Sequence, residues 1–160
     1  MRNSCGWTAL IIAVKYGQID VVDRLLQNKE CQINISNNLG STAIFFSTEN
    51  GHLEIVDKLI IYGSDIWHVN KDGETLLHFA SRGDNPQVLE RILSLGLDVN
   101  QQDNAGWTPL MKAVLYDHKE AIKILLDHGA DTKIKNNMGQ MALEIAINDD
   151  IKNLLTHKVS

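Results

Sequence analysis

Six histidines and two cysteines are the residues of this chain whose chemistry could support metal binding or nucleophilic attack. The cysteines, Cys5 and Cys31, lie far apart in the sequence, which matches neither a disulfide framework nor the paired spacing of metal ligands. No histidine belongs to a cluster with ligand spacing; they are His52, His68, His78, His118, His128 and His157. We therefore predict free thiols, no metal, no cofactor, and histidines that satisfy local helix ends.

The sequence also lacks the motifs of common catalytic chemistry. It contains no phosphate-binding Gly-x-x-x-x-Gly-Lys, no Gly-x-Ser-x-Gly nucleophile turn, no His-Glu-x-x-His zinc motif and no Cys-x-x-Cys pair. Its formal net charge of −5 argues against a nucleic-acid partner, because such binding usually requires a basic surface. We predict a protein that is not an enzyme and does not bind nucleic acid.

Composition and the N-terminal sequence bear on location. The hydrophobic content of 44% is usual for a folded, soluble chain. No secretory apolar stretch precedes Gly6, and the longest apolar run, from Ala9 to Val14, is too short to cross a membrane. We expect a cytoplasmic protein, with the nucleus as an alternative, and no membrane insertion.

The elements that must position any functional residue are set by a repeated glycine. Gly40, Gly73, Gly106 and Gly139 follow one another at equal intervals, and Gly6 precedes them at an interval longer by a single position. A period of about 33 residues is typical of stacked units that cannot bury their apolar faces alone and share one continuous core. The chain is therefore predicted to present a surface for interaction and not to carry out chemistry.

Each unit is predicted to contain two helices followed by a polar finger. Four of the five glycines are followed two places later by a threonine that can cap the first helix; these are Thr8, Thr42, Thr75 and Thr108. The second helix carries an apolar stripe, as in Val21, Val22, Leu25 and Leu26. About ten polar residues then precede the next glycine, which predicts an extended hairpin ending in a turn.

Particular residues are also predicted to end the first helices and to begin or end the second helices. Gly17 and Gly51 stop the first helix in two units, whereas Asp84 or Asn85 can cap the second helix of unit three, with Pro86 in its first turn. Asn28 is the predicted terminator of the second helix in unit one, which has no glycine there.

These phrases resemble the ankyrin repeat, and the resemblance covers nearly the whole chain in five units. It is carried by Gly106-Trp-Thr-Pro-Leu110, Thr75-Leu-Leu-His-Phe-Ala80, Asn50-Gly-His-Leu-Glu-Ile-Val56 and Leu125-Leu-Asp-His-Gly-Ala-Asp131. The resemblance implies an all-α solenoid of stacked antiparallel helix pairs with projecting β-hairpin or loop fingers. We expect one domain, 1–160, with repeats near 3–36, 37–69, 70–102, 103–135 and 136–160, the last a polar C-terminal cap.

The resemblance also implies a recognition face. In ankyrin proteins the finger tips and the exposed side of the first helices commonly form a concave binding surface. In this sequence that surface maps to the turn residues, the residue after each glycine, and the pair that ends the first helix. The candidates are Lys15, Tyr16, Asn38, Leu39, Ser41, Glu49, Asn50, Lys71, Asp72, Glu74, Arg82, Asn104, Ala105, Trp107, Leu115 and Tyr116. Their mixed charges favour a protein partner.

Large side chains at these positions are the strongest candidate anchors. Trp107, Tyr116 and Leu115 resemble the residues that dominate interface energies, although Trp107 could instead pack on the neighbouring finger. Trp7 occupies the place of Trp107 in unit one. Trp67 replaces a typically polar finger residue and is interpreted as packed.

Two further groups are assigned structural roles. Phe45, Phe46 and Phe79 fall on first helices and are interpreted as core. Asn100 resembles the asparagine that some ankyrin domains present to a hydroxylase, but it is interpreted as a turn-stabilising residue.

The leading functional hypothesis is a non-catalytic protein-interaction module that binds a partner through the concave face. One alternative is a targeting or regulatory segment of a longer enzyme or effector. Another is a structural spacer or an array that associates with itself through repeat one, where Ile11 and Ile12 are expected to leave an apolar edge without a polar cap.

Overall fold

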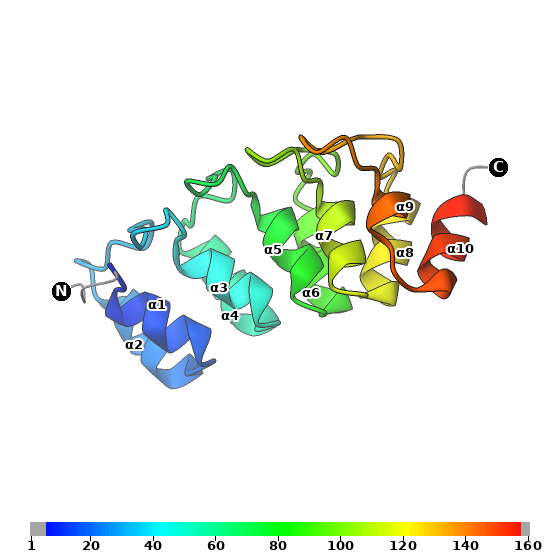
Figure 1. Cartoon of the computed structure of the whole chain (residues 1–160). Helices are drawn as coiled ribbons and strands as arrows, with labels where there is room; N and C mark the ends of the chain where they lie inside the picture. The colour runs from blue at the N-terminus through cyan, green and yellow to red at the C-terminus, as the bar shows by residue number, and fades with distance from the viewer. Residues whose placement is uncertain (1–5, 158–160) are drawn as a thin grey trace.

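The computed structural model describes residues 6–157, and within this range ten helices form five successive pairs along a curved stack (Figure 1). The pairs are α1 (Ala9–Lys15) with α2 (Ile19–Gln27), α3 (Ala43–Glu49) with α4 (Leu53–Ile61), α5 (Leu76–Arg82) with α6 (Pro86–Leu93), α7 (Pro109–Leu115) with α8 (Lys119–Asp127), and α9 (Ala142–Ile145) with α10 (Asp149–His157).

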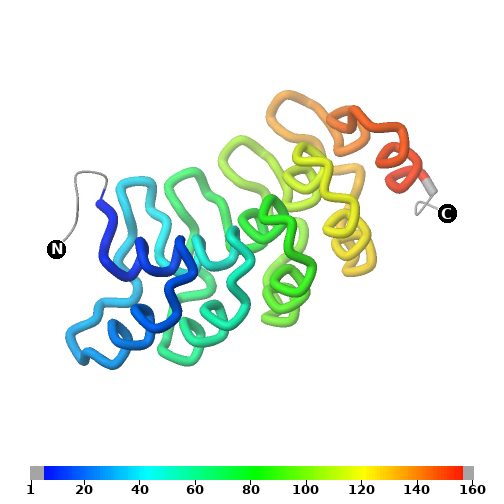
Figure 2. The backbone as a smooth tube through the Cα atoms, turned by 90° about the horizontal axis from the view of Figure 1, so that it is seen from below, coloured from blue at the N-terminus to red at the C-terminus, as the bar shows by residue number. Residues whose placement is uncertain are grey.

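The helices are arranged in two layers. First helices pack on the first helices of neighbouring units, from α1 through α9, and second helices contact one another from α4 through α8. The connecting fingers project side by side from the helices (Figure 2). The prediction of an all-α stack of helix pairs is confirmed.

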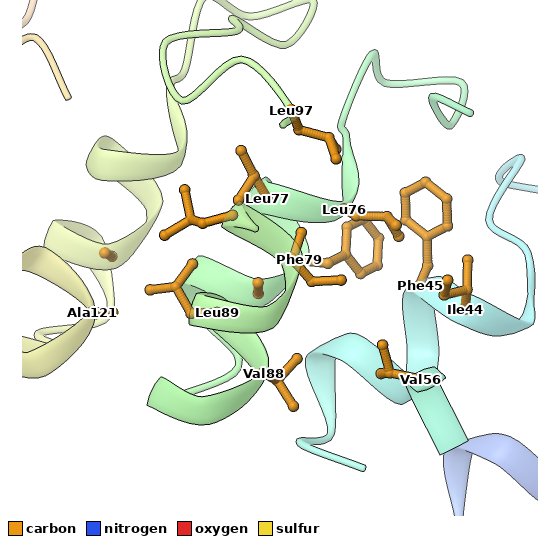
Figure 3. Close-up of a cluster of buried hydrophobic side chains, with 14 of the residues drawn as sticks. Ile44, Phe45, Val56, Leu76, Leu77, Phe79, Val88, Leu89, Leu97 and Ala121 are labelled. Atoms are coloured by element: carbon orange, nitrogen blue, oxygen red, sulfur yellow. The ribbon is translucent and has the colours of Figure 1, made fainter. Parts of the chain in front are cut away.

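Equivalent apolar residues form the core between the two layers. On the second helices the equivalent residues of the first four units are completely buried; these are Val22, Val56, Leu89 and Ile122. They face the buried residues of the first helices, as the central part of the core shows (Figure 3). Complete burial of such a side chain is worth roughly 1.5–3 kcal/mol. Since each residue is covered from its own and adjacent units, no unit buries its apolar residues alone.

The predicted threonine caps all precede first helices, but they act differently. The Oγ1 atoms of Thr8 and Thr108 accept hydrogen bonds from backbone N–H groups three residues on, at 3.1 and 3.3 Å. The backbone N–H of Thr75 instead donates to the ring of His78. The Thr42 hydroxyl is buried and has no hydrogen-bond partner among the described residues, so it does not act as predicted.

The predicted start of α6 is confirmed, and the predicted end of α2 is confirmed in position but not in backbone conformation. Asn85 caps α6, accepting from the Val88 N–H at 3.0 Å, and Pro86 begins the helix. Asn28 is the C-cap residue of α2, but its backbone is extended, with φ −76° and ψ 117°, and not left-handed.

The first and last units differ from what the sequence predicts. Ile11 is fully buried under the neighbouring unit, so its assignment to an exposed edge is wrong; Ile12 is 39% exposed. In the last unit Glu144 is exposed and polar as expected, but Ile147 is 93% exposed. Polar and apolar side chains are thus both exposed in the last unit, and its role as a polar cap stays a prediction.

Candidate functional site

Each finger tip is built around one buried asparagine or aspartate. The side-chain Oδ1 of this residue accepts backbone N–H groups from the residues two and four places on, at 2.8–3.0 Å. The residues are Asn37, Asn70, Asp103 and Asn136. Sequence analysis missed them, although they recur with the period of the glycines and lie three places before them. They fix the tip conformation before any partner binds.

Adjacent finger tips are joined by backbone hydrogen bonds. The Lys71 N–H donates to the Leu39 carbonyl at 3.0 Å, and the Asn104 N–H donates to the Asp72 carbonyl at 2.9 Å. An equivalent bond of 3.0 Å, from the Asn137 N–H to the Ala105 carbonyl, joins the third and fourth fingers. These bonds set a constant spacing between tips, and so they position the tip side chains along the row.

A hollow of about 580 Å³ lies between the first two fingers and the first helices. Much of its lining is aromatic: the rings of Trp7 and Phe46 have centroids 4.7 Å apart, and the Arg82 guanidinium lies 3.7 Å from the centre of the Phe79 ring. The complete lining is Trp7, Asn37, Asn38, Leu39, Ser41, Phe46, Glu49, Asn70, Asp72, Glu74, Phe79 and Arg82.

A second hollow of about 500 Å³ continues toward the third finger. It shares Asp72, Glu74 and Arg82 with the first and adds Asp103, Asn104, Ala105, Trp107 and Lys112. Because they share three lining residues, the two hollows adjoin one another across α3, α5 and α7, and together we call them the groove.

Charged side chains from three units form a network in the groove. The Glu74 carboxylate lies 3.0 Å from Arg82 Nη1 and 3.0 Å from Lys112 Nζ. Lys112 also reaches Asp103 at 2.9 Å, and Arg82 Nε donates to Glu49 at 2.8 Å. The side chains of Glu74 and Asp103 are only 8% and 4% exposed. The network therefore links α3, α5 and α7 through the second and third fingers.

The network keeps its carboxylates charged. Burial alone would raise the pKa of the Glu74 carboxyl, but Arg82 and the hydrogen bond from Lys112 outweigh it and hold the pKa below its usual value. Burial also opposes ionisation of Asp103, yet the bonds from Lys112 and the Trp107 backbone lower its pKa. Burial would lower the pKa of Lys112, but its two carboxylate partners raise it.

The buried ring of His78 makes a further link between α5 and the finger that carries Trp107. Its Nδ1 accepts the Thr75 N–H at 3.1 Å, and its Nε2 lies 2.9 Å from the Trp107 carbonyl. This arrangement assigns the hydrogen to Nε2, because Nδ1 is an acceptor. Burial lowers the pKa of the His78 ring, so the imidazole is neutral and ties α5 to the next finger.

The structure brings ten of the sixteen predicted contact residues together in the groove. They are Asn38, Leu39, Ser41, Glu49, Asp72, Glu74, Arg82, Asn104, Ala105 and Trp107. Two of them are not exposed as the prediction requires: Ser41 and Glu74 are 2% and 6% accessible. The chain turns back into the helix at these positions, and the Glu74 carboxylate is enclosed by its cationic partners.

The other six candidates lie outside the groove. Tyr16, Leu115 and Tyr116 are more than half exposed at the ends of α1 and α7. Asn50 uses its side chain to bond the Phe46 carbonyl at 2.8 Å. The remaining two are Lys15, whose ammonium lies 4.9 Å from the Trp7 ring, and Lys71, which is exposed at a finger tip.

The aromatic residues divide between core and groove. Phe45 and Phe79 are buried as predicted, but Phe46 is only partly buried and faces the first hollow, which the core interpretation missed. Trp107 packs partly against the core and also lines the second hollow. Trp67 is 64% exposed, so the prediction that it packs is wrong.

Asn100 links two units, whereas its own turn is bonded by Asp98, whose Oδ1 accepts the Asn100 N–H at 2.9 Å, so the prediction of a turn-stabilising side chain is wrong. The Asn100 Oδ1 accepts the Asp131 N–H at 2.8 Å, and its Nδ2 donates to the Gly129 carbonyl at 3.3 Å. Both side-chain groups thus bind the backbone of the next unit. Asn34 makes an equivalent pair of bonds near the start of the stack, along the same edge.

The histidines of the described chain contact backbone carbonyls. Ring nitrogens of His52, His68, His118 and His128 lie 2.7–3.3 Å from carbonyl oxygens, as does that of His78. Over residues 6–157 no group of three histidine, cysteine or acidic side chains is placed to hold a metal. Cys31 is a free, partly buried thiol, whereas Cys5 and the side chain of His157 lie outside the described residues.

Comparison with protein families identifies the stack. The family model "Ankyrin repeats (3 copies)" matches four overlapping segments, residues 1–70, 30–103, 48–136 and 77–159. A comparison with curated proteins gives no match. In the described range, none of the helices has the length and apolar character needed to cross a bilayer. Since the matched segments together cover almost all of the sequence, the chain belongs to the ankyrin repeat family, whose members generally bind proteins.

Proposed function

We propose that this chain is a non-catalytic protein-interaction module that holds a segment of a partner protein in the groove. The observation that carries this proposal is the groove itself: two hollows with three residues in common, whose lining includes ten residues that the resemblance to ankyrin repeats selects. Family membership supports protein as the class of partner.

The size and lining of the groove favour a peptide segment as its occupant. Ligand sites in proteins usually enclose about 300–1,000 Å³, and the first hollow alone measures about 580 Å³. Aromatic and arginine side chains dominate the energetics of protein interfaces. Trp7, Phe46 and Arg82 supply both kinds within one hollow, and Trp107 adds an aromatic ring in the next.

Rigidity of the groove also supports binding. Its tips are fixed by buried Asn37, Asn70 and Asp103, and its helices are linked by the Glu74 network. A preorganised site loses less conformational entropy on binding than one that must first be ordered. We therefore expect partner binding to leave the finger backbone almost unchanged.

Two matched variants test whether the groove is the binding site. Leu39 and Met138 occupy the same place in their turns, are 63% and 68% exposed, and each donates its N–H to the tip asparagine. Only Leu39 lines the groove. We expect Leu39→Arg to abolish capture of a partner from cell extract, and Met138→Arg to leave capture intact.

Cross-linking and quantitative mass spectrometry of the captured proteins provide the readout. Cross-links to residues 37–41 and 70–74 are expected for the genuine partner. A protein retained equally by the wild type and both variants, with cross-links elsewhere on the stack, would exclude the groove as its binding site.

A further inference from the structure

The ionisable residues of the groove carry an excess of negative charge. Four carboxylates line it, Glu49, Asp72, Glu74 and Asp103, against two cations, Arg82 and Lys112. The groove therefore has a formal charge of −2, obtained as two positive minus four negative groups. An occupant with the opposite charge gains Coulomb energy that an acidic or neutral occupant does not.

Two of the four carboxylates retain acceptor capacity for a partner. Asp72 is exposed at the second finger tip, and its side chain has no ion pair within the described part of the chain. Glu49 is bound to Arg82 through Oε1, and its side chain is 34% exposed. Glu74 and Asp103, in contrast, are enclosed by the cations.

The cations of the groove are already engaged. Arg82 contacts two carboxylates and the Phe79 ring, and Lys112 contacts two carboxylates and lies 5.6 Å from the Trp107 ring. An acidic side chain entering the groove would have to compete with these contacts and would approach Asp72 and Glu49, which repel it.

Asp72 and Glu49 line the same hollow as the rings of Trp7 and Phe46. We propose that the groove selects a partner segment in which a large aliphatic or aromatic side chain lies close to a lysine or arginine. The apolar side chain fills the hollow against the two rings, and the cation bonds Asp72 and the open side of Glu49. This inference rests on the proposed function, because it specifies the chemistry of that partner.

A library of random short peptides displayed on phage tests the chemistry without assuming a partner. Selection on the wild-type protein is expected to enrich sequences that combine a large apolar residue with lysine or arginine. The enriched peptides should bind Asp72→Asn roughly three- to tenfold more weakly than wild type, and binding should weaken as salt is raised. Glu49→Gln should act in the same direction.

Asp20→Asn is the matched control for Asp72→Asn. Asp20 is also an exposed aspartate, but it lies in the first turn of α2 and does not line the groove. Both changes remove one negative charge from the chain, so a general charge effect would weaken both variants equally. We expect peptide affinity for Asp20→Asn to equal that of the wild type.

Amide shifts in NMR titrations separate failure of this inference from failure of the proposed function. Groove-bound peptides shift residues 37–41 and 70–74. Enriched peptides that shift these residues but lack basic side chains, or that bind Asp72→Asn as tightly as wild type, overturn the inference and leave the groove as a protein-binding site. If no enriched peptide shifts these residues, both proposals are refuted.

Discussion

Glu74 holds the groove together because its carboxylate is shared by two cations on different helices. Arg82 lies on the same unit, whereas Lys112 comes from α7 of the next unit. A buried ion pair gains little over apolar packing, but removing one partner leaves a charge that is neither solvated nor neutralised. Lys112 is the critical member, because it alone contacts both Glu74 and Asp103.

We expect Lys112→Met to lower the free energy of unfolding by about 3 kcal/mol, because buried Asp103 then loses its cation and Glu74 keeps only Arg82. Lys119→Met is the comparison, since the Lys119 and Asp150 side chains are 47% and 67% exposed, and solvent screens such a pair so that its loss should cost much less. Urea unfolding followed by circular dichroism measures both. Equal losses in the two variants would show that the groove network is no more stabilising than a surface pair.

Trp67 replaces a residue that ties units together elsewhere in this chain. Asn34 and Asn100 lie one period before and after it, and each bonds the carbonyl and N–H of the following unit. An indole ring lacks an acceptor and cannot reproduce this pair of bonds. The edge between units two and three therefore carries an exposed tryptophan in place of an asparagine that bonds the next unit. We call the pair of bonds made by Asn34 and by Asn100 the clamp.

Trp67→Asn is expected to raise the free energy of unfolding by about 1 kcal/mol, because the new side chain can bond Gly96 and Asp98 as its equivalents bond their neighbours. Trp67→Ala removes the exposed ring without supplying the bonds, and it should give no such gain. The midpoint of urea unfolding at constant slope distinguishes the variants. If both substitutions have the same effect, the clamp is not the cause.

Finger stacking depends on a glycine at each tip where the next finger approaches. Gly73 has φ 75°, and a Cβ atom at this position would come within 2.9 Å of the Asn104 backbone nitrogen and even closer to its Oδ1 atom. Gly139 has nearly the same φ, 78°, but a Cβ atom there would meet no described atom within 4 Å. Comparing a substitution at Gly73 with the same substitution at Gly139 therefore separates the cost of backbone strain from the cost of collision between fingers.

Both Gly73→Ala and Gly139→Ala should destabilise the fold by about 1 kcal/mol through the left-handed backbone. Gly73→Ala should cost roughly 1–3 kcal/mol more, because the second and third fingers must move apart. Chemical unfolding of the two variants gives this difference directly. A difference near zero would mean that the fingers adjust freely and that the tip spacing in the groove is not fixed.

The sequence predicts elements better than contacts, and particular residues show why. The glycine period and the threonine before each of the first four helix pairs are local signals, so the number and order of helices follow from them. The exposure of Glu74 is not local: it depends on Lys112, which lies in the next unit and bonds it at 3.0 Å. The prediction for Trp67 is wrong for the same reason, because its surroundings belong to the next unit.

The resemblance to ankyrin repeats also selects ten residues of the groove, but it predicts neither how deep they lie nor that Phe46 and Lys112 join them. Ser41 and Asp72 each lie near a tip glycine, yet one is buried and the other exposed. The tip asparagine bonds the backbone at both positions, so the difference arises from the path of the chain: Asp72 lies in the turn, whereas Ser41 follows the glycine and leads back into α3. That asparagine has the same period as the glycine, so its role could have been found from the sequence.

At the scale of the molecule, stability should decrease toward the end of the described stack. A repeat array is stabilised by the helices of each unit and by the interfaces between neighbouring units. The last unit is weaker because α9 has only four residues and its N-cap residue, Met141, has no hydroxyl. Glu144 compensates in part by accepting the Met141 N–H at 2.7 Å.

Native-state hydrogen exchange is therefore expected to show lower protection in α9 and α10 than in α5 and α6. Met141→Thr supplies a capping hydroxyl worth about 0.5–1 kcal/mol, which should slow exchange in α9 and α10 roughly two- to fivefold. Met138→Thr makes the same change at an exposed tip that caps no helix, and it should slow neither. Because coupling in a stack passes only between neighbours, α1 and α2 should exchange at unchanged rates in both variants. Slowing throughout the molecule would instead show that the five units unfold together.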